Sequence, residues 1–302
     1  MSSQAAHARS SLDPRPAVLL LHGLCANPLE LMPLARTLRT AGYVVEVPAL
    51  PGYGVAADAG GQRMPVTRFE AWVDQAARHF DALAETHQRV AVGGLSMGSV
   101  LALALAMERP AAALMLLSTS LHFDGWNVSP WRRLLPLAYL PPLRHWLKFR
   151  ESPPYGIKNE RLREWVAQAM TSSHVSAAGA DTLPATALYQ ASRMIRRVRA
   201  GLSRIEAPTV ILHATQDDVS GPRSVAELKR RLGTHPEVHW FHDSYHMLTL
   251  DNERGAVSQA ASRFLQREVP APRTNPDNGF VSPVVSSAFP HPQEESFHEQ
   301  HA

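Results

Sequence analysis

A serine flanked two positions away on each side by glycine is the feature that most restricts how this chain folds. Residues 94–98 read Gly-Leu-Ser-Met-Gly, between an apolar run at 90–92 and a helix-forming run at 100–107. This pattern is typical of a nucleophile elbow, a strand-to-helix turn so tight that it strains the serine backbone and exposes the hydroxyl. Glycine suits the flanking positions because they leave hardly any room for a side chain. The context favours a catalytic Ser96 over an ordinary Gly/Ser turn.

A serine nucleophile needs a histidine base and a carboxylate that orients the histidine, and both follow later in the chain. Residues 209–213 read as a buried strand, with Asp217 and Asp218 just after it. A second expected strand at 237–241 precedes His246. These side chains fall in loops at the carboxyl ends of strands, where open α/β sheets place their sites. Asp217 and His246 therefore lie where the carboxylate and the base of such a serine are expected.

Each of these two assignments has an alternative. Asp218 is the other candidate carboxylate, and we expect it instead to cap the following turn or to face water. His242 is the other candidate base, because it lies nearer to the end of the strand. His213 and His239 fall inside the expected strands, so we interpret them as structural.

An apolar strand expected at residues 17–21 runs directly into His22 and Gly23. A His-Gly turn in this position commonly shapes an oxyanion hole, which uses a backbone N–H just past the glycine and one from the residue after the nucleophile. The amides of Leu24 and Met97 are thus the expected donors. His22 is expected to brace the turn rather than to transfer protons.

Taken together, these segments resemble the α/β-hydrolase superfamily, and within it the small bacterial carboxylesterases and monoacylglycerol lipases. The resemblance spans roughly residues 15 to 268 and depends on residues 22–24, 94–98, 213–219 and 246–251. It favours Asp217 over Asp218 as the carboxylate. It also favours His246 over His242 as the base, because apolar residues follow His246 as they do in the family. The chain departs from the pattern at Ala214, where relatives often have glycine, and at Tyr245, which replaces a small residue and could narrow access to the site.

The resemblance implies a cofactor-free serine hydrolase that acts on carboxylic esters with small apolar acyl groups, such as monoacylglycerols. Ser96 would attack the ester carbonyl while His246 takes its proton and Asp217 holds the imidazole. An acyltransferase or thioesterase with the same triad is one alternative. A hydrolase-like binding protein without turnover is another, although all the reacting groups are present.

Composition narrows the other classes of function. The chain has 302 residues, of which 45% are hydrophobic, so it can bury a sizeable core. Its only cysteine, Cys25, excludes an intrachain disulfide, and residues 1–9 hold no apolar stretch of signal-peptide length, so we expect a cytoplasmic protein. The net charge of +3 comes without an arginine–aromatic pattern, which argues against nucleic acid as a partner. No histidine pair has zincin spacing, so no metal is expected. The oligomeric state is left open.

Alternating strand and helix signals predict a parallel sheet covered by helices on both faces. About six strands are expected, near residues 17–21, 44–48, 89–93, 113–117, 209–213 and 237–241. Residues 67–70 read as a capping-box start for a helix that buries Trp72 and Phe80. A last helix is expected to begin near Asp251.

The expected organisation is a flexible leader (1–14), an α/β-hydrolase core (15–118 and 205–268), a helical cap (119–204) and a disordered tail (269–302). The cap segment contains four of the six tryptophans, many prolines and helix-like segments without intervening strands. In the family this is where a cap is inserted over the site, and such a cap excludes water and supplies an apolar pocket.

Residues 131–140 of the expected cap mix apolar and basic side chains. One hypothesis is a lipid-facing or acyl-gripping surface with weak membrane contact, because basic amphipathic segments lie well on anionic interfaces. The alternative, which we favour from the sequence, is a helix packed on the core with exposed arginines.

Overall fold

The computed structural model describes residues 12–54, 65–173, 175–176 and 179–272, and it describes no side chains from 170 to 178. The expected leader and tail lie almost entirely outside these residues, so their flexibility stays a prediction. Among the described helices, none combines the length and apolar content that crossing a bilayer requires.

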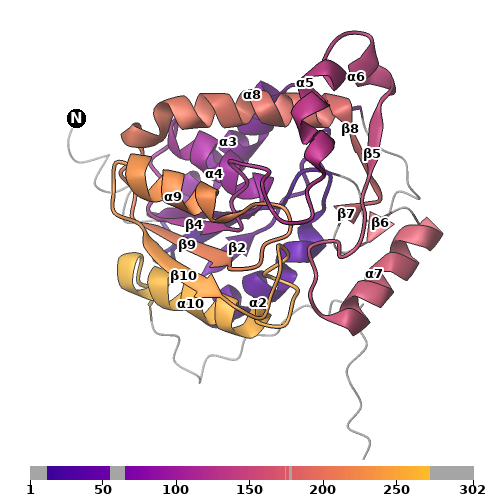
Figure 1. Ribbon diagram of the computed structural model, residues 1–302. Helices are drawn as coiled ribbons and strands as arrows, with labels where there is room; N and C mark the ends of the chain where they lie inside the picture. The colour runs from indigo at the N-terminus through magenta and orange to yellow at the C-terminus, as the bar shows by residue number, and fades with distance from the viewer. Residues whose placement is uncertain (1–11, 55–64, 174, 177–178, 273–302) are drawn as a thin grey trace, which may run out of the picture. The chain divides into compact units, whose positions relative to one another are not determined.

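Six parallel strands form the central sheet of residues 12–272 (Figure 1). Each neighbouring pair is parallel, and the register of β1 against β3 runs from Ala17 opposite Val90 to Leu21 opposite Gly94. The predicted fold class is therefore confirmed, with β2 two residues shorter than expected. The spatial order is β10 (Glu237–Phe241), β9 (Thr209–Ala214), β4 (Leu114–Leu117), β3 (Val90–Leu95), β1 (Ala17–Leu21) and β2 (Val44–Glu46).

Helices cover both faces of this sheet, and the side chains of β1 show why. Successive residues of a strand point to opposite faces, so Leu19 and Leu21 join one buried cluster while Val18 and Leu20 join the other. The first cluster lies under α3 (Phe69–Thr86), α4 (Met97–Ala106), α8 (Ala185–Gly201) and α9 (Pro222–Arg231); the second lies under α2 (Met32–Thr40) and α10 (Arg254–Glu268) (Figure 1).

The start of α3 differs from the expected capping box. The residue before the helix is Arg68, which makes no side-chain cap, and Thr67 donates its amide to the carbonyl of Gly52. The amide of Phe69 bonds to Gln190 Oε1 on α8 instead, at 3.3 Å. The capping-box prediction is wrong because a residue distant in sequence satisfies this helix end.

The expected burial on α3 and α10 is confirmed. Trp72 and Phe80 lie in the cluster beneath α3. The side chains expected to be buried by the last helix are all in the other cluster, namely Val257, Ala261, Phe264 and Leu265.

The segment expected to be a purely helical cap also contains short strands. β5 (Lys148–Arg150) pairs antiparallel with β8 (Thr182–Pro184), and β6 (Val175–Ser176) pairs antiparallel with β7 (Gly179–Ala180). The expectation of no strands is wrong here, because two or three residues are too few to show a period.

The remaining elements are η1 (Pro28–Leu31), η2 (Pro130–Leu134), α5 (Leu135–Ala138), α6 (Leu143–Trp146), α7 (Glu160–Ser173) and η3 (Leu202–Arg204). The helix α8 belongs to the expected cap but packs on α3 and α4 of the expected core. The boundary between cap and core at residue 204 therefore stays a prediction.

Gly98 lets the first turn of α4 press against the end of β1. A Cβ at this position would overlap the carbonyl oxygen of Leu21. We expect Gly98→Ala to lower the free energy of unfolding by about 3 kcal/mol, as in other overpacked sites, because the obstacle is backbone and cannot rotate away. Thermal unfolding followed by circular dichroism measures the loss.

Gly255→Ala is the matched control, because a Cβ there would meet nothing within 4 Å and the residue lies inside helix α10. This variant should be more stable than the wild type by about 0.5–1 kcal/mol, owing to the higher helix propensity of alanine. Equal melting temperatures for the two variants would contradict the close approach described for Gly98.

Candidate active site

Ser96 is the single residue between the end of β3 at Leu95 and the start of α4 at Met97. Its φ and ψ are 58° and −118°, a left-handed conformation that strains any residue with a side chain. Its amide donates to the carbonyl of Leu117 at 2.8 Å, and its hydroxyl lies 3.2 Å from Ser120 Oγ. The local geometry is that of the strained turn that the Gly-x-Ser-x-Gly pattern predicts.

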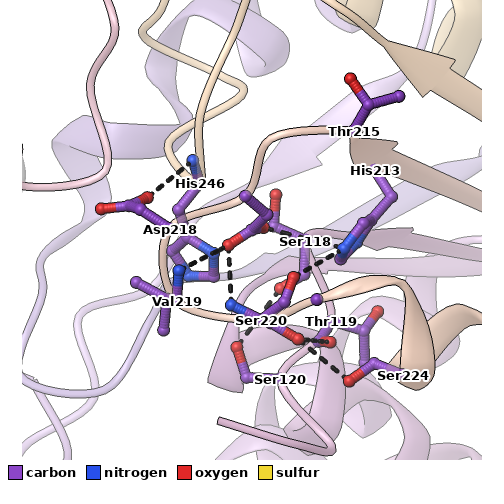
Figure 2. Close-up of polar contacts among 12 residues, drawn as sticks. Ser118, Thr119, Ser120, His213, Thr215, Asp218, Val219, Ser220, Ser224 and His246 are labelled. Atoms are coloured by element: carbon purple, nitrogen blue, oxygen red, sulfur yellow. Dashed lines mark hydrogen bonds and ion pairs between the residues drawn. The ribbon is translucent and has the colours of Figure 1, made fainter. Parts of the chain in front are cut away.

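His246 and Asp217 are held against each other by the loops that follow β10 and β9. His246 Nδ1 lies 2.9 Å from both carboxylate oxygens of Asp217, and both residues are buried. Oδ1 of Asp217 also accepts the amides of Val219 (2.9 Å) and Ser220 (2.7 Å), which fix the carboxylate. Figure 2 shows Val219 and Ser220 next to the ring of His246. Because Nδ1 bonds to a carboxylate, it carries the ring proton in the neutral imidazole, and this sets the tautomer of His246.

The charges of this pair stabilise each other. Burial alone would raise the pKa of Asp217, but the charge and hydrogen bond of His246 outweigh burial and hold that pKa below its ordinary value. Burial would likewise lower the pKa of His246, and the charge and hydrogen bond of Asp217 instead raise it. The imidazole is therefore a better proton acceptor than a buried histidine would be by itself.

The two alternatives, Asp218 and His242, have other contacts. The carboxylate of Asp218 accepts the amides of Gly156 (3.1 Å) and His246 (3.3 Å), and the residue is buried. The expectation that it caps the next turn or faces water is wrong, because the cap segment covers it. His242 is exposed, and its carbonyl accepts a hydrogen bond from Lys158 Nζ. The structure thus brings Asp217, and not Asp218, to the imidazole of His246.

Leu24 and Met97 border the same cavity as Ser96 and His246. Met97 is the first residue of α4, so its N–H has no acceptor within the helix. On either side of Leu24 the backbone is anchored. The amide of Gly23 donates to Glu30 Oε1 at 2.6 Å, and the amide of Cys25 donates to the carbonyl of Tyr53 at 3.0 Å.

His22 braces this turn, as the sequence predicts. The side chain is fully buried, and its Nδ1 lies 2.9 Å from the carbonyl oxygen of Gly23. Tyr53 donates its hydroxyl to the carbonyl of His22 at 3.0 Å. Burial lowers the pKa of His22 to about 4, so the ring is neutral at neutral pH. The contacts of His22 are those of a structural support.

A cavity of about 650 Å³ opens beside Ser96 and His246. Most of its wall is apolar and comes from the expected cap segment, and the polar side chains of Ser96 and His246 also line it. Its apolar lining includes Phe123, Leu134, Leu137, Leu147, Leu183 and Met247. Such a space suits an apolar group attached to a polar reacting centre.

Residues 156–158, in the expected cap, are hydrogen-bonded to the loop that carries His246. The carbonyl of Gly156 accepts the amide of Met247 at 2.8 Å. The carboxylate of Asp251 accepts the amides of Lys158 and Tyr245, each at 2.8 Å. The last helix therefore begins at Arg254, three residues later than expected, because Asp251 joins two loops.

Glu30 is a residue at this site that the sequence analysis missed. It is 1% exposed, borders the cavity and holds the Gly23 amide beside Leu24. Burial raises its pKa to about 8, against the opposing effect of the Gly23 hydrogen bond. The available signal was a single acidic residue inside the apolar run at 28–34. Glu151 borders the cavity as well, and burial raises its pKa to about 7.

The raised pKa of Glu30 makes its effect on stability depend on pH. The folded state keeps this proton between the ordinary pKa of 4.5 and about 8, so stability falls by about 1.4 kcal/mol per pH unit as the pH rises through that range. Glu30→Gln keeps an acceptor for Gly23 and cannot ionise. We expect its melting temperature to exceed that of the wild type by more at pH 8 than at pH 5.

Glu85→Gln, exposed on α3, serves as the matched control and should show no such pH-dependent gain. A gain of equal size at pH 5 and pH 8 for Glu30→Gln would show that Glu30 does not hold a proton in the folded state.

Residues 13–253 match the family described as serine aminopeptidase, S33 (Hydrolase_4). The chain belongs to the S33 family. It is therefore an α/β-hydrolase and an enzyme of the serine hydrolase type, which confirms the resemblance seen in the sequence.

Two curated relatives of this S33 chain come from Bacillus. It is 26% identical over 253 residues to a carboxylesterase of Bacillus subtilis (strain 168), covering 83% of this chain and 92% of that protein. It is 25% identical over 251 residues to a thermostable monoacylglycerol lipase of Bacillus sp. (strain H-257), covering 83% and 90%. A crystal structure of a monoacylglycerol lipase from Paleococcus ferrophilus superposes with a TM-score of 0.68 at 19% identity, covering 84% and 96%, which supports the fold.

Proposed function

We propose that this S33 chain hydrolyses carboxylic esters with a triad of Ser96, His246 and Asp217. One observation carries the proposal: the strained Ser96 and a histidine bonded to a buried carboxylate border the same apolar cavity. The amides of Leu24 and Met97 are the proposed oxyanion donors, since both residues border that cavity beside Ser96.

The proposed reaction has two halves. Ser96 Oγ attacks the ester carbonyl carbon while His246 Nε2 takes the hydroxyl proton, and Asp217 stabilises the imidazolium through Nδ1. The two backbone amides bind the oxyanion. The C–O bond to the alcohol then breaks as His246 returns the proton to the leaving oxygen. Water, deprotonated by the same imidazole, attacks the carbonyl carbon of the acyl-serine. The bond from this carbon to Ser96 Oγ then breaks as His246 returns the proton to Oγ, and the acid is released.

An ester with an apolar acyl group, such as a monoacylglycerol, is the proposed substrate class. The apolar lining of the cavity favours such an acyl group over a charged one. The names of the two Bacillus relatives, a carboxylesterase and a monoacylglycerol lipase, support the same class.

Turnover of p-nitrophenyl esters of increasing chain length, measured alongside monoacylglycerols, tests this proposal. We expect kcat/KM to rise from acetate to medium-length chains, because each buried CH₂ contributes up to about 0.8 kcal/mol of binding. Flat or falling kcat/KM with chain length would contradict an apolar acyl site.

Labelling and product analysis separate the proposed hydrolase from its alternatives. A fluorophosphonate probe should label the wild type and should not label Ser96→Ala; absence of labelling in the wild type would favour a binding protein without turnover. Product partition with added alcohol, together with turnover of acyl thioesters, would reveal an acyltransferase or a thioesterase.

A further inference from the structure

Residues 126–150 expose an unusual amount of apolar side chain. Trp131 and Trp146 are 76% and 80% exposed, although tryptophan is on average a highly buried residue. Among residues 131–140 only Ala138 is buried, so the alternative of a helix packed on the core is wrong. Five leucines of the segment are each at least 40% exposed: Leu134, Leu137, Leu140, Leu143 and Leu147.

The same segment is strongly cationic. It contains no aspartate or glutamate, although the whole chain has 27 acidic residues for a net charge of +3. The rest of the chain therefore carries a small excess of negative charge. Among the described residues, no ion pair joins the cations of this segment to a carboxylate. These cations are Arg132, Arg133, Arg144, Lys148 and Arg150.

This apolar and cationic surface lies at the opening of the cavity. Leu134, Leu137 and Leu147 are exposed and also border the cavity that holds Ser96. The elements that carry the surface, α5, α6 and β5, lie together and away from α2 and α10 (Figure 1). An apolar molecule that leaves a lipid layer in contact with this surface reaches the opening of the cavity directly.

We propose that residues 126–150 dock this protein on an anionic lipid–water interface, with the cavity opening turned towards the lipid. Exposed tryptophans and leucines insert into the boundary of the acyl chains, and the five cations meet anionic headgroups. A second copy of the chain is a poorer occupant, because a two-fold contact through this face would bring the two sets of cations together. The exposed apolar surface would otherwise be a liability for a monomer in water.

Co-sedimentation of the full chain with vesicles tests the proposal. We expect binding to vesicles that contain phosphatidylglycerol, weakened by added salt, and much weaker binding to pure phosphatidylcholine. The double variant Arg133→Gln/Lys148→Gln should lower the partition constant for anionic vesicles about 30-fold, since each cation near the surface contributes about 1 kcal/mol. Trp146→Ala should lower binding to both kinds of vesicle by about tenfold.

Lys229→Gln/Arg230→Gln, exposed on α9, removes the same charge outside the segment and should bind as the wild type does. None of the positions Arg133, Lys148 and Trp146 borders the cavity, so turnover of a soluble short-chain ester should stay unchanged in those variants. Vesicle binding needs no turnover, so its result is independent of the proposed ester hydrolysis.

Several outcomes would overturn the docking proposal. One is that the wild type does not bind to anionic vesicles. Another is that the α9 control loses as much vesicle binding as Arg133→Gln/Lys148→Gln does. A third is that the wild type binds to anionic vesicles and to pure phosphatidylcholine vesicles with equal affinity. A dimer in light scattering that Trp146→Ala dissociates, without any vesicle binding, would assign the surface to a second copy instead.

Discussion

Ser96→Ala should abolish ester turnover, with kcat falling by about 10⁶, because the change removes the proposed nucleophile. The fold should survive the change. Alanine at this strained φ is no worse than serine, and among the described residues the Ser96 hydroxyl makes one hydrogen bond, with Ser120 Oγ. Burst and steady-state kinetics with a p-nitrophenyl ester, together with a melting curve, measure both effects.

Ser120→Ala is the matched control, since it removes the partner of the Ser96 hydroxyl and leaves the nucleophile in place. This variant should keep activity within about tenfold of the wild type, because a buried hydroxyl–hydroxyl contact contributes about 1 kcal/mol. Turnover near the wild-type level in carefully purified Ser96→Ala would mean that another residue is the nucleophile.

Asp217→Asn is expected to lower kcat by about 10⁴, the cost of a wrong tautomer and an unstabilised imidazolium in a triad. It should also change the pH profile. The wild type loses activity as the pH falls through the raised pKa of His246, because the protonated imidazole cannot act as a base. Without the Asp217 charge, burial lowers that pKa, so the acidic limb of kcat/KM should move to lower pH.

Asp218→Asn is the neighbouring comparison. Its carboxylate contacts two backbone amides and has no hydrogen bond to the ring of His246 among the described contacts, so we expect a loss of about tenfold. Its charge also helps to raise the pKa of His246, so the acidic limb should move in the same direction as in Asp217→Asn but by less. Near-wild-type activity in Asp217→Asn with a large loss in Asp218→Asn would exchange the two roles.

Local sequence patterns predicted the sheet and the strained turn well. The strands β1, β4 and β9 are mostly apolar, fully buried runs that end at polar residues, so their positions follow from neighbouring residues alone. The turn at Ser96 was predictable because Gly94 and Gly98 are required by contacts within the same strand–turn–helix unit and with β1. Chain order then placed Asp217 and His246 at the same edge of the sheet.

The features that the sequence did not reveal depend on contacts between distant segments. The end of α3 is satisfied by Gln190, more than a hundred positions away. Asp218 is covered by Gly156, and the proton on Glu30 reflects complete burial rather than any nearby residue type. The strands β5 to β8 are too short to carry a period, and only their pairing defines them.

The hydrogen bonds from residues 156–158 to the loop of His246 limit how this enzyme can be trimmed. Deleting the whole insertion would remove the acceptor for Met247 and two amide donors to Asp251, those of Lys158 and Asn159. The loop that carries the imidazole would then lose these contacts, even though every reacting group remained. A minimal version of the protein would have to retain this tether, and chimeras that exchange caps between relatives should place their junctions outside it.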